Sequence, residues 1–372
     1  MTFVPDYGIS TGVLENFIVE VTQQCNFRCG YCCFSGEYAG MRSHNNRSMP
    51  VDTARNTIDF ICRHAPAEGP VYVSFYGGEA LLEFGLVIRI IEALRLRLGT
   101  RVIFDVSTNG WLLSPDVVDR ILTVPDVNVS VSLDGTARIH DRNRRHSSGA
   151  VTFGKIVANL QYFKRKNETE YRRRIRLLVT VGSMDDLREI DRSFATLGDL
   201  AGDKPILVSH LLPNFARNIL FRDSLETKTA FIEEALEQKR SGASNLHTRV
   251  FDELQLKRQR KFECDGCASL KLHTCVNSLQ SCFINIDGTV FPCEKVKEHC
   301  AIGDVCGGID PDRIRKLAVK YALRRNMVCH DCDYVAYCKR CLIDLNYSLA
   351  EQKILCDDYK ENVDLALKYG YE

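Results

Sequence analysis

Residues 25–32 read Cys-Asn-Phe-Arg-Cys-Gly-Tyr-Cys, and this run is the most informative stretch of the chain. Three thiolates can hold three irons of a cubane iron–sulfur cluster and leave the fourth iron without a protein ligand, whereas four cysteines saturate a cluster. An open iron can bind a cofactor or a substrate. Cys25, Cys29 and Cys32 are therefore predicted metal ligands. A zinc site is the alternative, but zinc would want a fourth Cys or His close by, and the adjacent Cys33 points elsewhere if Cys32 is a ligand.

The composition describes a chain with a large core and no charge excess. It has 372 residues, 45% of them hydrophobic, and a formal net charge of +1, which does not call for nucleic acid. The start of the chain lacks a signal-peptide pattern, and no apolar run approaches the ~20 residues that span a bilayer. We therefore expect a cytoplasmic protein with neither a nucleic acid nor a membrane as partner. Thiols stay reduced in that compartment, so the 17 cysteines favour metal ligation over disulfides.

The cysteines fall into two groups, which is the main evidence for two domains. Five lie between Cys25 and Cys62 and twelve between Cys264 and Cys356, while about 200 residues between the groups contain none. We predict one domain over residues 1–239, a polar and basic bridging segment over 240–263, and a cysteine-rich domain over 264–372.

Apolar, β-branched runs alternate with longer amphipathic stretches through the first domain. We predict strands at residues 17–22, 71–75, 102–107, 127–133, 177–181 and 206–211. We predict helices at residues 51–63, 82–98, 115–122, 153–164, 185–196 and 225–239, with Ser114 as the N-cap before Pro115. Six strand–helix units imply an α/β fold with a parallel sheet and right-handed crossovers, and they are too few for a closed eight-stranded barrel. The predicted fold is a partial (β/α)6 barrel of TIM-like form.

Polar and glycine-containing segments follow the predicted strands at their carboxyl ends, where such barrels carry their chemistry. Residues 76–80 read Tyr-Gly-Gly-Glu-Ala, residues 107–110 read Ser-Thr-Asn-Gly, and residues 132–135 read Ser-Leu-Asp-Gly. Gly77 and Gly78 let the backbone approach a ligand closely, and Glu79 can accept a hydrogen bond from an ammonium group. An ordinary glycine turn is the alternative reading of this segment.

Together these motifs resemble those of the radical S-adenosylmethionine (radical SAM) superfamily. A similar Gly-Gly-Glu-Pro segment in that family holds the methionyl amino group, with Ala80 here in place of the proline. Arg144 best matches the arginine that contacts SAM in peptide-modifying members, and a guanidinium fork suits the SAM carboxylate. Arg145 is the other candidate for this role, and a solvated basic turn is the alternative interpretation of the segment. The resemblance implies as SAM-binding residues Tyr31, Gly77, Gly78, Glu79, Ser107, Thr108, Asn109, Ser132, Asp134 and Arg144. It also implies reductive cleavage of SAM to a 5′-deoxyadenosyl radical, which abstracts hydrogen from a substrate.

The late cysteines resemble the SPASM domain, an accessory domain of radical SAM enzymes that often act on peptides. By position in that family, one [4Fe–4S] cluster would be held by Cys275, Cys282, Cys293 and Cys341. The other would be held by Cys329, Cys332, Cys338 and Cys356, which makes three [4Fe–4S] clusters in all. Only two residues separate Cys338 and Cys341 where three are usual. A zinc ribbon is the alternative, and ligation by Cys264, Cys267, Cys300 or Cys306 stays open.

Three functions follow from the resemblance, in this order. The first is oxidative modification or crosslinking of a ribosomally made peptide (a RiPP maturase). The second is an anaerobic sulfatase-maturating enzyme that forms formylglycine from Cys or Ser; those enzymes place an aspartate where Glu294 stands, so Glu294 is the candidate catalytic base. The third is a non-catalytic iron–sulfur or zinc protein, which leaves the first motif unexplained.

The implied partners are a peptide or protein substrate and an external one-electron donor such as flavodoxin or ferredoxin. Only 24 residues precede Cys25, so we expect no N-terminal leader-binding domain. Leader binding would then need a separate leader-binding protein or another groove. The basic run at residues 172–174, with Arg176, is predicted to lie on a solvated surface, and holding an acidic peptide is the alternative.

Overall fold

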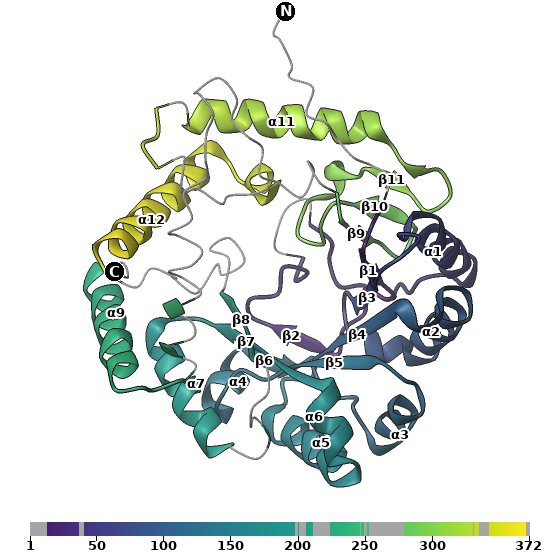
Figure 1. Ribbon diagram of the computed structural model, residues 1–372, viewed down its shortest axis with the longest axis horizontal. Helices are drawn as coiled ribbons and strands as arrows, with labels where there is room; N and C mark the ends of the chain where they lie inside the picture. Colours follow the sequence, from purple (N-terminus) through teal and green to yellow (C-terminus); the bar gives the residue numbers. More distant parts are fainter. Residues whose placement is uncertain are drawn as a thin grey trace, which may run out of the picture.

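The computed structural model describes residues 13–36, 41–197, 200, 206–210, 224–245, 247–248, 251–252, 279–329, 331–334 and 342–369. Over these residues a sheet of ten strands runs in the order β12-β11-β10-β9-β1-β3-β4-β5-β7-β8. Figure 1 shows the sheet inside a ring of helices, with α11 and α12 on the side of the ring opposite α3 and α5. None of the described helices is long and apolar enough to cross a bilayer.

Six of these strands form the parallel half of the sheet, and all six predicted strands are confirmed. They are β1 (Asn16–Glu20), β3 (Val71–Tyr76), β4 (Val102–Thr108), β5 (Val127–Ser132), β7 (Ile175–Val181) and β8 (Ile206–His210). Each pairs in parallel with its neighbour in the sheet. Alternate side chains such as Val71, Val73 and Phe75 are completely buried, because successive residues of a strand face opposite sides of the sheet.

The predicted helices are confirmed with small shifts of their ends. They are α1 (Val51–His64), α2 (Phe84–Leu98), α3 (Pro115–Thr123), α5 (Phe153–Lys166), α7 (Met184–Thr196) and α9 (Leu225–Arg240). The helix predicted to begin at Leu82 starts instead as a separate 3-10 turn, η1 (Ala80–Glu83). Ser114 occupies the N-cap of α3 with Pro115 as the first helical residue, but its side chain makes no capping hydrogen bond.

Two short strands and two short α-helices that precede β7 in the chain were not predicted. They are β2 (Phe27–Cys29), α4 (Ala137–Asn143), β6 (Arg144–His146) and α6 (Glu168–Arg174). β2 and β6 form a separate antiparallel sheet in which Cys29 lies opposite Arg144. Strands of three residues are too short to show an alternating pattern in the sequence.

The cysteine-rich part of the chain extends the same sheet. β9 (Ser281–Ile284) pairs in parallel with β1, and β10 (Thr289–Phe291), β11 (Gly303–Asp304) and β12 (Gly308–Ile309) follow in antiparallel order. Two longer helices come next, α11 (Pro311–Cys329) and α12 (Leu349–Lys368), with the 3-10 turn η6 (Leu342–Asn346) between them. The predicted limits of the bridging segment and of the second domain stay predictions, since residues 253–278 lie outside the description.

An ion-pair cluster joins α9 to α12 and closes the ring. The ammonium of Lys228 lies 2.8 Å from Asp358 and 2.5 Å from Glu361. The Lys228 side chain is nearly buried while both carboxylates are half-exposed. The last helix is thereby held against α9, the helix that follows β8 in the described chain (Figure 1).

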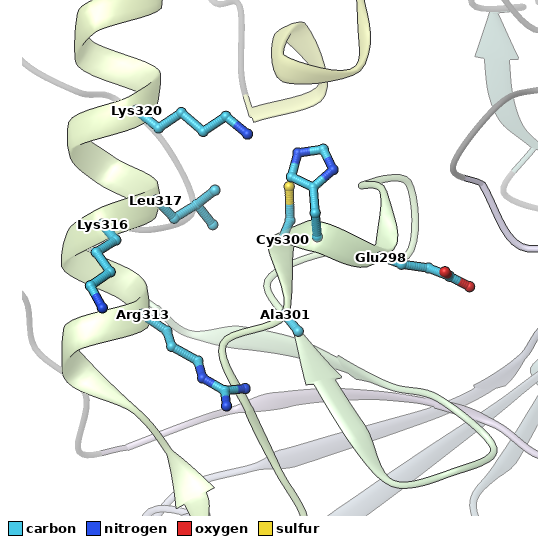
Figure 2. Close-up of a pocket in the computed structure, with 8 residues that line it drawn as sticks. Glu298, Cys300, Ala301, Arg313, Lys316, Leu317 and Lys320 are labelled. Carbon is cyan, nitrogen blue, oxygen red and sulfur yellow. The ribbon is translucent and has the colours of Figure 1, made fainter.

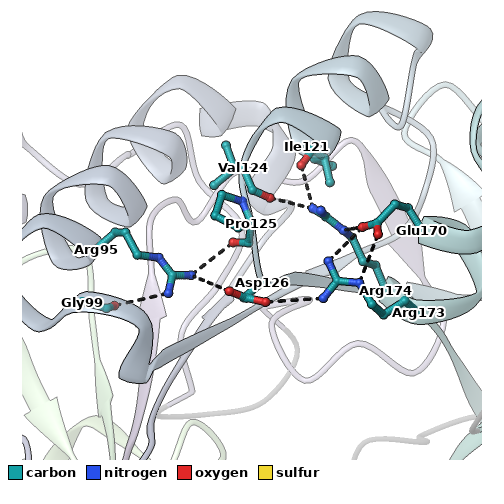
Figure 3. A network of polar contacts seen from close by, with 9 residues as sticks. All are labelled: Arg95, Gly99, Ile121, Val124, Pro125, Asp126, Glu170, Arg173 and Arg174. Atoms are coloured by element: carbon teal, nitrogen blue, oxygen red, sulfur yellow. Dashed lines mark hydrogen bonds and ion pairs between the residues drawn. The ribbon is translucent and has the colours of Figure 1, made fainter.

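The basic run at residues 172–174 is not a uniformly solvated surface, and that prediction is wrong for Arg174. Arg174 is 4% exposed and donates hydrogen bonds to the carbonyl oxygens of Ile121, at 2.8 Å, and Val124, at 2.6 Å. Its guanidinium also pairs with Glu170. Figure 3 shows how Arg173, Asp126 and Arg95 continue this network. The arginines therefore bind the end of α3 to α6.

We expect Arg174→Met to lower the free energy of unfolding by about 2–3 kcal/mol, because it leaves the buried carbonyl oxygen of Val124 without its donor and removes the ion pair with Glu170. Anaerobic urea unfolding followed by circular dichroism measures the change. The matched control is Arg172→Met, since Arg172 makes an exposed pair with Glu168 on the same helix and should cost about 0.5 kcal/mol or less. Equal losses in the two variants would contradict the structural role of Arg174.

Candidate cluster and cofactor site

A cavity of about 380 Å³ lies at the carboxyl ends of the parallel strands. It brings together the three cysteines of the first motif and nine of the ten predicted SAM-binding residues, drawn from four separate strand ends. These lining residues are Cys25, Cys29, Tyr31, Cys32, Gly77, Gly78, Glu79, Ser107, Thr108, Asn109, Ser132 and Arg144. Parallel strands end at the same edge of a sheet, so residues far apart in the chain meet there.

The cysteine loop follows β1 and is shaped by its own backbone. The amide of Cys32 donates to the carbonyl oxygen of Cys29 at 3.1 Å, and β2 holds Cys29 beside Arg144. Burial raises the pKa of the Cys25 thiol to about 12, and burial also raises the pKa of Cys29, which Arg144 opposes.

The donor set fits an iron–sulfur cluster. Among the described residues, no three His, Cys, Asp or Glu side chains are grouped closely enough to hold one metal ion. A cubane takes one thiolate at each of three irons, and the three thiols of the motif line one cavity.

Gly77 and Gly78 are required by the cysteine loop itself. The amide of Gly78 donates to the carbonyl oxygen of Thr22 at 3.0 Å, and the amide of Glu79 donates to that of Gln24 at 2.7 Å. A Cβ atom on Gly78 would lie 1.8 Å from the Gln24 oxygen, and Gly77 has a φ of 133°, which side chains rarely adopt. Both glycines thus approach the backbone that carries Cys25, and they also line the cavity, so their contact with a ligand stays a prediction.

Glu79 is buried with its carboxylate held by three donors. It accepts hydrogen bonds from the Thr108 hydroxyl at 2.7 Å, the Asn109 amide at 2.8 Å and the Leu81 amide at 3.0 Å. Burial raises the pKa of Glu79, and these hydrogen bonds oppose the rise. A carboxylate offers about four acceptor sites, so one site remains for a ligand ammonium group.

Asp134 is the predicted SAM-binding residue that does not line the cavity. It is completely buried and accepts hydrogen bonds from the Tyr31 hydroxyl at 2.5 Å, from Arg144 Nε at 2.7 Å and from the Thr180 amide at 2.8 Å. The Arg144 guanidinium lies 5.1 Å from the centre of the Tyr31 ring. Asp134 thus orients two side chains of the cavity wall from behind.

A second wall of the cavity comes from the late part of the chain. Glu294 and Lys295, which follow β10, line the same cavity. The Cys293 thiol donates to Glu294 Oε2 at 3.2 Å, and the Lys295 ammonium lies 3.9 Å from Glu294 Oε1. The structure therefore places the candidate base Glu294 at the cavity that holds the first cysteine motif.

Arg42 joins the two walls, and no motif predicted it. It is 3% exposed, its Nε lies 3.5 Å from Glu20 Oε1, and its Nη2 donates to the carbonyl oxygen of Glu294. The guanidinium also lies 4.3 Å from the centre of the Phe283 ring and 4.9 Å from that of Phe34. Such contacts stabilise a buried cation.

Several further lining residues were not predicted. They are Phe27, Cys33, Phe34, His44, Tyr76, Leu178 and Thr180. The Nε2 atom of His44 lies 3.4 Å from the Sγ atom of Cys32. A histidine twelve residues after a cysteine carries no recognisable spacing signal, so only the folded loop reveals this contact.

The auxiliary-cluster cysteines are only partly within the description. Cys282 is completely buried in β9, Cys293 is half-buried, and Cys329 ends α11 with its carbonyl oxygen 3.2 Å from the amide of Cys332. Cys356 is half-buried on α12. Five cysteines lie outside the described residues: Cys264, Cys267, Cys275, Cys338 and Cys341. Both predicted ligand sets stay predictions, as does any ligand role for the buried Cys300 and the exposed Cys306.

Comparison with known proteins agrees with this geometry. Residues 19–190 match the family model of the Radical SAM superfamily. The chain is 21% identical over 370 residues to a cysteine-type anaerobic sulfatase-maturating enzyme of Clostridium perfringens. This match covers 95% of this chain and 96% of that protein. Two other relatives are matched over about half their length. One is an uncharacterized protein of Methanocaldococcus jannaschii, which is 29% identical over 37% of this chain and 44% of its own length. The other is a cysteine-type anaerobic sulfatase-maturating enzyme of Clostridium novyi, which is 26% identical over 49% of this chain and 47% of its own length.

Solved structures show the same fold. The structure of anSMEcpe with bound AdoMet and the Cp18Cys peptide superposes with a TM-score of 0.66 at 18% identity, covering 96% of this chain and 97% of that one. Streptococcus suis SuiB bound to the precursor peptide SuiA superposes with a TM-score of 0.52 at 14% identity, covering 77% and 61%. These findings support a radical SAM domain over residues 19–190, with the cysteine loop at the strand ends of a partial barrel.

Proposed function

We propose that this enzyme oxidises a residue of a peptide or protein substrate by abstracting a hydrogen atom from it. One observation carries the proposal: the cavity at the first cysteine motif has a second wall with a carboxylate and an ammonium group, from Glu294 and Lys295. A substrate group bound between the walls would lie beside the SAM site and within reach of a polar side chain that can accept a proton.

The chain's own residues would bind and orient the cofactor. When bound, a [4Fe–4S] cluster with SAM would supply the 5′-deoxyadenosyl radical. Cys25, Cys29 and Cys32 would hold the cluster, the remaining acceptor site of Glu79 would take the SAM amino group, and Arg144 would pair with the SAM carboxylate.

Glu294 would accept the proton of the substrate thiol or hydroxyl. Its carboxylate is held next to the cavity by a backbone contact to Arg42 and by the neighbouring Lys295. General-base catalysis of this kind contributes about 10²–10⁴-fold to a rate. Lys295 supplies a donor for a peptide carbonyl or carboxylate oxygen of the substrate.

The comparisons support two substrate classes. A ribosomally made precursor peptide is supported by the shared fold with SuiB, which was solved with its precursor peptide. A sulfatase segment containing Cys or Ser, converted to formylglycine, is supported by the full-length similarity to sulfatase-maturating enzymes. Incubating the reconstituted enzyme and SAM anaerobically with a Cys-containing sulfatase peptide separates the two: an aldehyde product assigns the second class, and an unchanged peptide leaves the precursor peptide as the substrate.

We further propose two auxiliary [4Fe–4S] clusters on the late cysteines. Anaerobic reconstitution should then yield about twelve irons per chain, because each cubane contains four. A content near four, with the SAM-cleaving cluster intact, would contradict the auxiliary clusters. Zinc in place of the missing iron would favour a zinc ribbon in the late part of the chain.

We expect Glu294→Gln to slow product formation by about 10²–10³-fold while SAM cleavage stays within about twofold, because the amide keeps the shape and loses the proton acceptor. Chromatography measures peptide product and 5′-deoxyadenosine in the same reaction. Glu294→Asp should restore part of the rate, and the matched control Glu68→Gln lies on an exposed loop and should change neither. Equal losses of product and 5′-deoxyadenosine would instead give Glu294 a role in cofactor binding.

A further inference from the structure

A second pocket, of about 420 Å³, lies between α11 and the 3-10 turn η4 (Glu298–Cys300). Figure 2 shows Arg313, Leu317 and Lys320 of α11 extending toward Cys300 and Ala301 across the pocket, with Lys316, also a lining residue, lying along the helix. Lys320 extends toward the turn, while the carboxylate of Glu298 points away from the helix. The pocket opens at the surface, because Arg313, Lys316 and Lys320 are all exposed.

The positive charge of this pocket is only partly compensated. Arg313 pairs with Asp310 at 3.3 Å, but neither Lys316 nor Lys320 has an ion-pair partner in the part of the chain that the structure describes. The charges of Lys320 and Lys297 both lower the pKa of the buried Cys300 thiol, against the larger rise that burial causes. Lys297 is therefore a fourth cation near the pocket. The chain as a whole has a net charge of only +1, so this is a local positive field.

The same side of α11 carries exposed apolar residues farther along. Leu323 is 57% exposed and Met327 is 70% exposed. Residues 313, 316, 320, 323 and 327 follow the three-and-four spacing that places side chains on one side of a helix. We call these five residues the α11 face. Its basic half adjoins the pocket, and its apolar half leads toward Cys329, about 14 Å beyond Lys320 at 1.5 Å per residue.

We propose that the α11 face is the docking surface for an acidic one-electron carrier protein. The proposal rests on the proposed function, since cleavage of SAM needs one electron from outside the chain. The carrier loses one electron and this chain gains it, with no bond or proton transferred. A protein suits the surface better than a small anion does, because exposed apolar side chains continue the charged area, and protein interfaces combine apolar contacts with charges that steer encounter.

The test uses the reconstituted enzyme and two carriers, a bacterial flavodoxin and a ferredoxin. The double variant Lys316→Glu, Lys320→Glu should weaken binding of the carriers about tenfold or more at low ionic strength, and salt should erase much of the difference. The neutral variant Lys316→Gln, Lys320→Gln should lose less. Arg89→Glu, an exposed residue of α2, is the matched control and should bind like the parent chain.

Two readouts separate this proposal from the proposed function. Calorimetric titration with the oxidised carriers measures docking without any reaction. Carrier-driven production of 5′-deoxyadenosine should fall with docking, while dithionite-driven production should match the parent. Unchanged binding of both carriers by the double variant would overturn the proposal. So would a loss of inorganic phosphate binding with carrier binding intact, because the pocket would then be a small-anion site. Failure of the parent chain to cleave SAM with dithionite would count against the proposed function alone.

Discussion

Replacing Cys29 by Ala is expected to abolish the formation of 5′-deoxyadenosine from SAM. Cys29 lines the cavity at the strand ends, and β2 and β6 hold it opposite Arg144. An alanine removes one of the three thiolates on which the first cluster depends. Product should fall below detection when dithionite is the reductant, and the iron content should fall by about four per chain.

The matched control for this variant is Cys62→Ala. Cys62 lies on α1 and is partly buried against the core, so losing its sulfur should leave both iron content and SAM cleavage unchanged. Far-ultraviolet circular dichroism of the two variants tests whether the fold survives. SAM cleavage by the Cys29 variant at the parent rate would refute the assignment of the first motif, whatever the late cysteines bind.

Arg42→Met is expected to lower the free energy of unfolding by about 3–5 kcal/mol, because it leaves the buried carboxylate of Glu20 without its partner. Glu20 is 1% exposed and lies 3.5 Å from the Arg42 guanidinium. The variant also loses the hydrogen bond that holds the backbone of Glu294. In a variant that stays folded at low temperature, we therefore expect the KM for the peptide substrate to rise more than the KM for SAM.

Two further variants test this assignment. Arg47→Met changes an exposed arginine of the same loop and should alter unfolding by about 0.5 kcal/mol or less. Adding Glu20→Gln to Arg42→Met should recover part of the lost stability, since no unpaired charge then remains buried. Urea unfolding measures both effects. A double variant as unstable as the sum of the single variants would show that Glu20 and Arg42 do not act as a pair.

The parallel half of the fold could be predicted because its information is local. Runs such as Val71–Tyr76 and Val102–Thr108 are rich in apolar and β-branched residues. Each is followed by an amphipathic stretch, so a strand–helix order follows from neighbouring residues alone. Parallel topology then requires that the strand ends meet. Cys25, Glu79 and Thr108 could therefore be assigned to one site before any contact between them was known.

Other parts of the site depend on contacts that no short stretch of sequence encodes. Asp134 was predicted to face the cofactor, but the folded chain turns it to hold Tyr31 and Arg144 from behind. The basic run ending at Arg174 was predicted to be solvated, yet its last residue is buried and donates to two carbonyl oxygens at the end of α3.

The amino-acid sequence by itself determined the cysteine motif, the strand–helix alternation and hence the edge of the sheet where the chemistry lies. Only the tertiary structure decided what faces that edge. Gln23 contacts Asn285 across 262 residues of chain and Arg42 contacts Glu294 across 252, and so the second wall of the cavity exists only once β9 has paired with β1. Such contacts form only when the long stretch of chain between the two residues closes into a loop, which costs conformational entropy. The free energy that offsets this cost comes from the buried core of the whole sheet, and no short stretch of sequence indicates it.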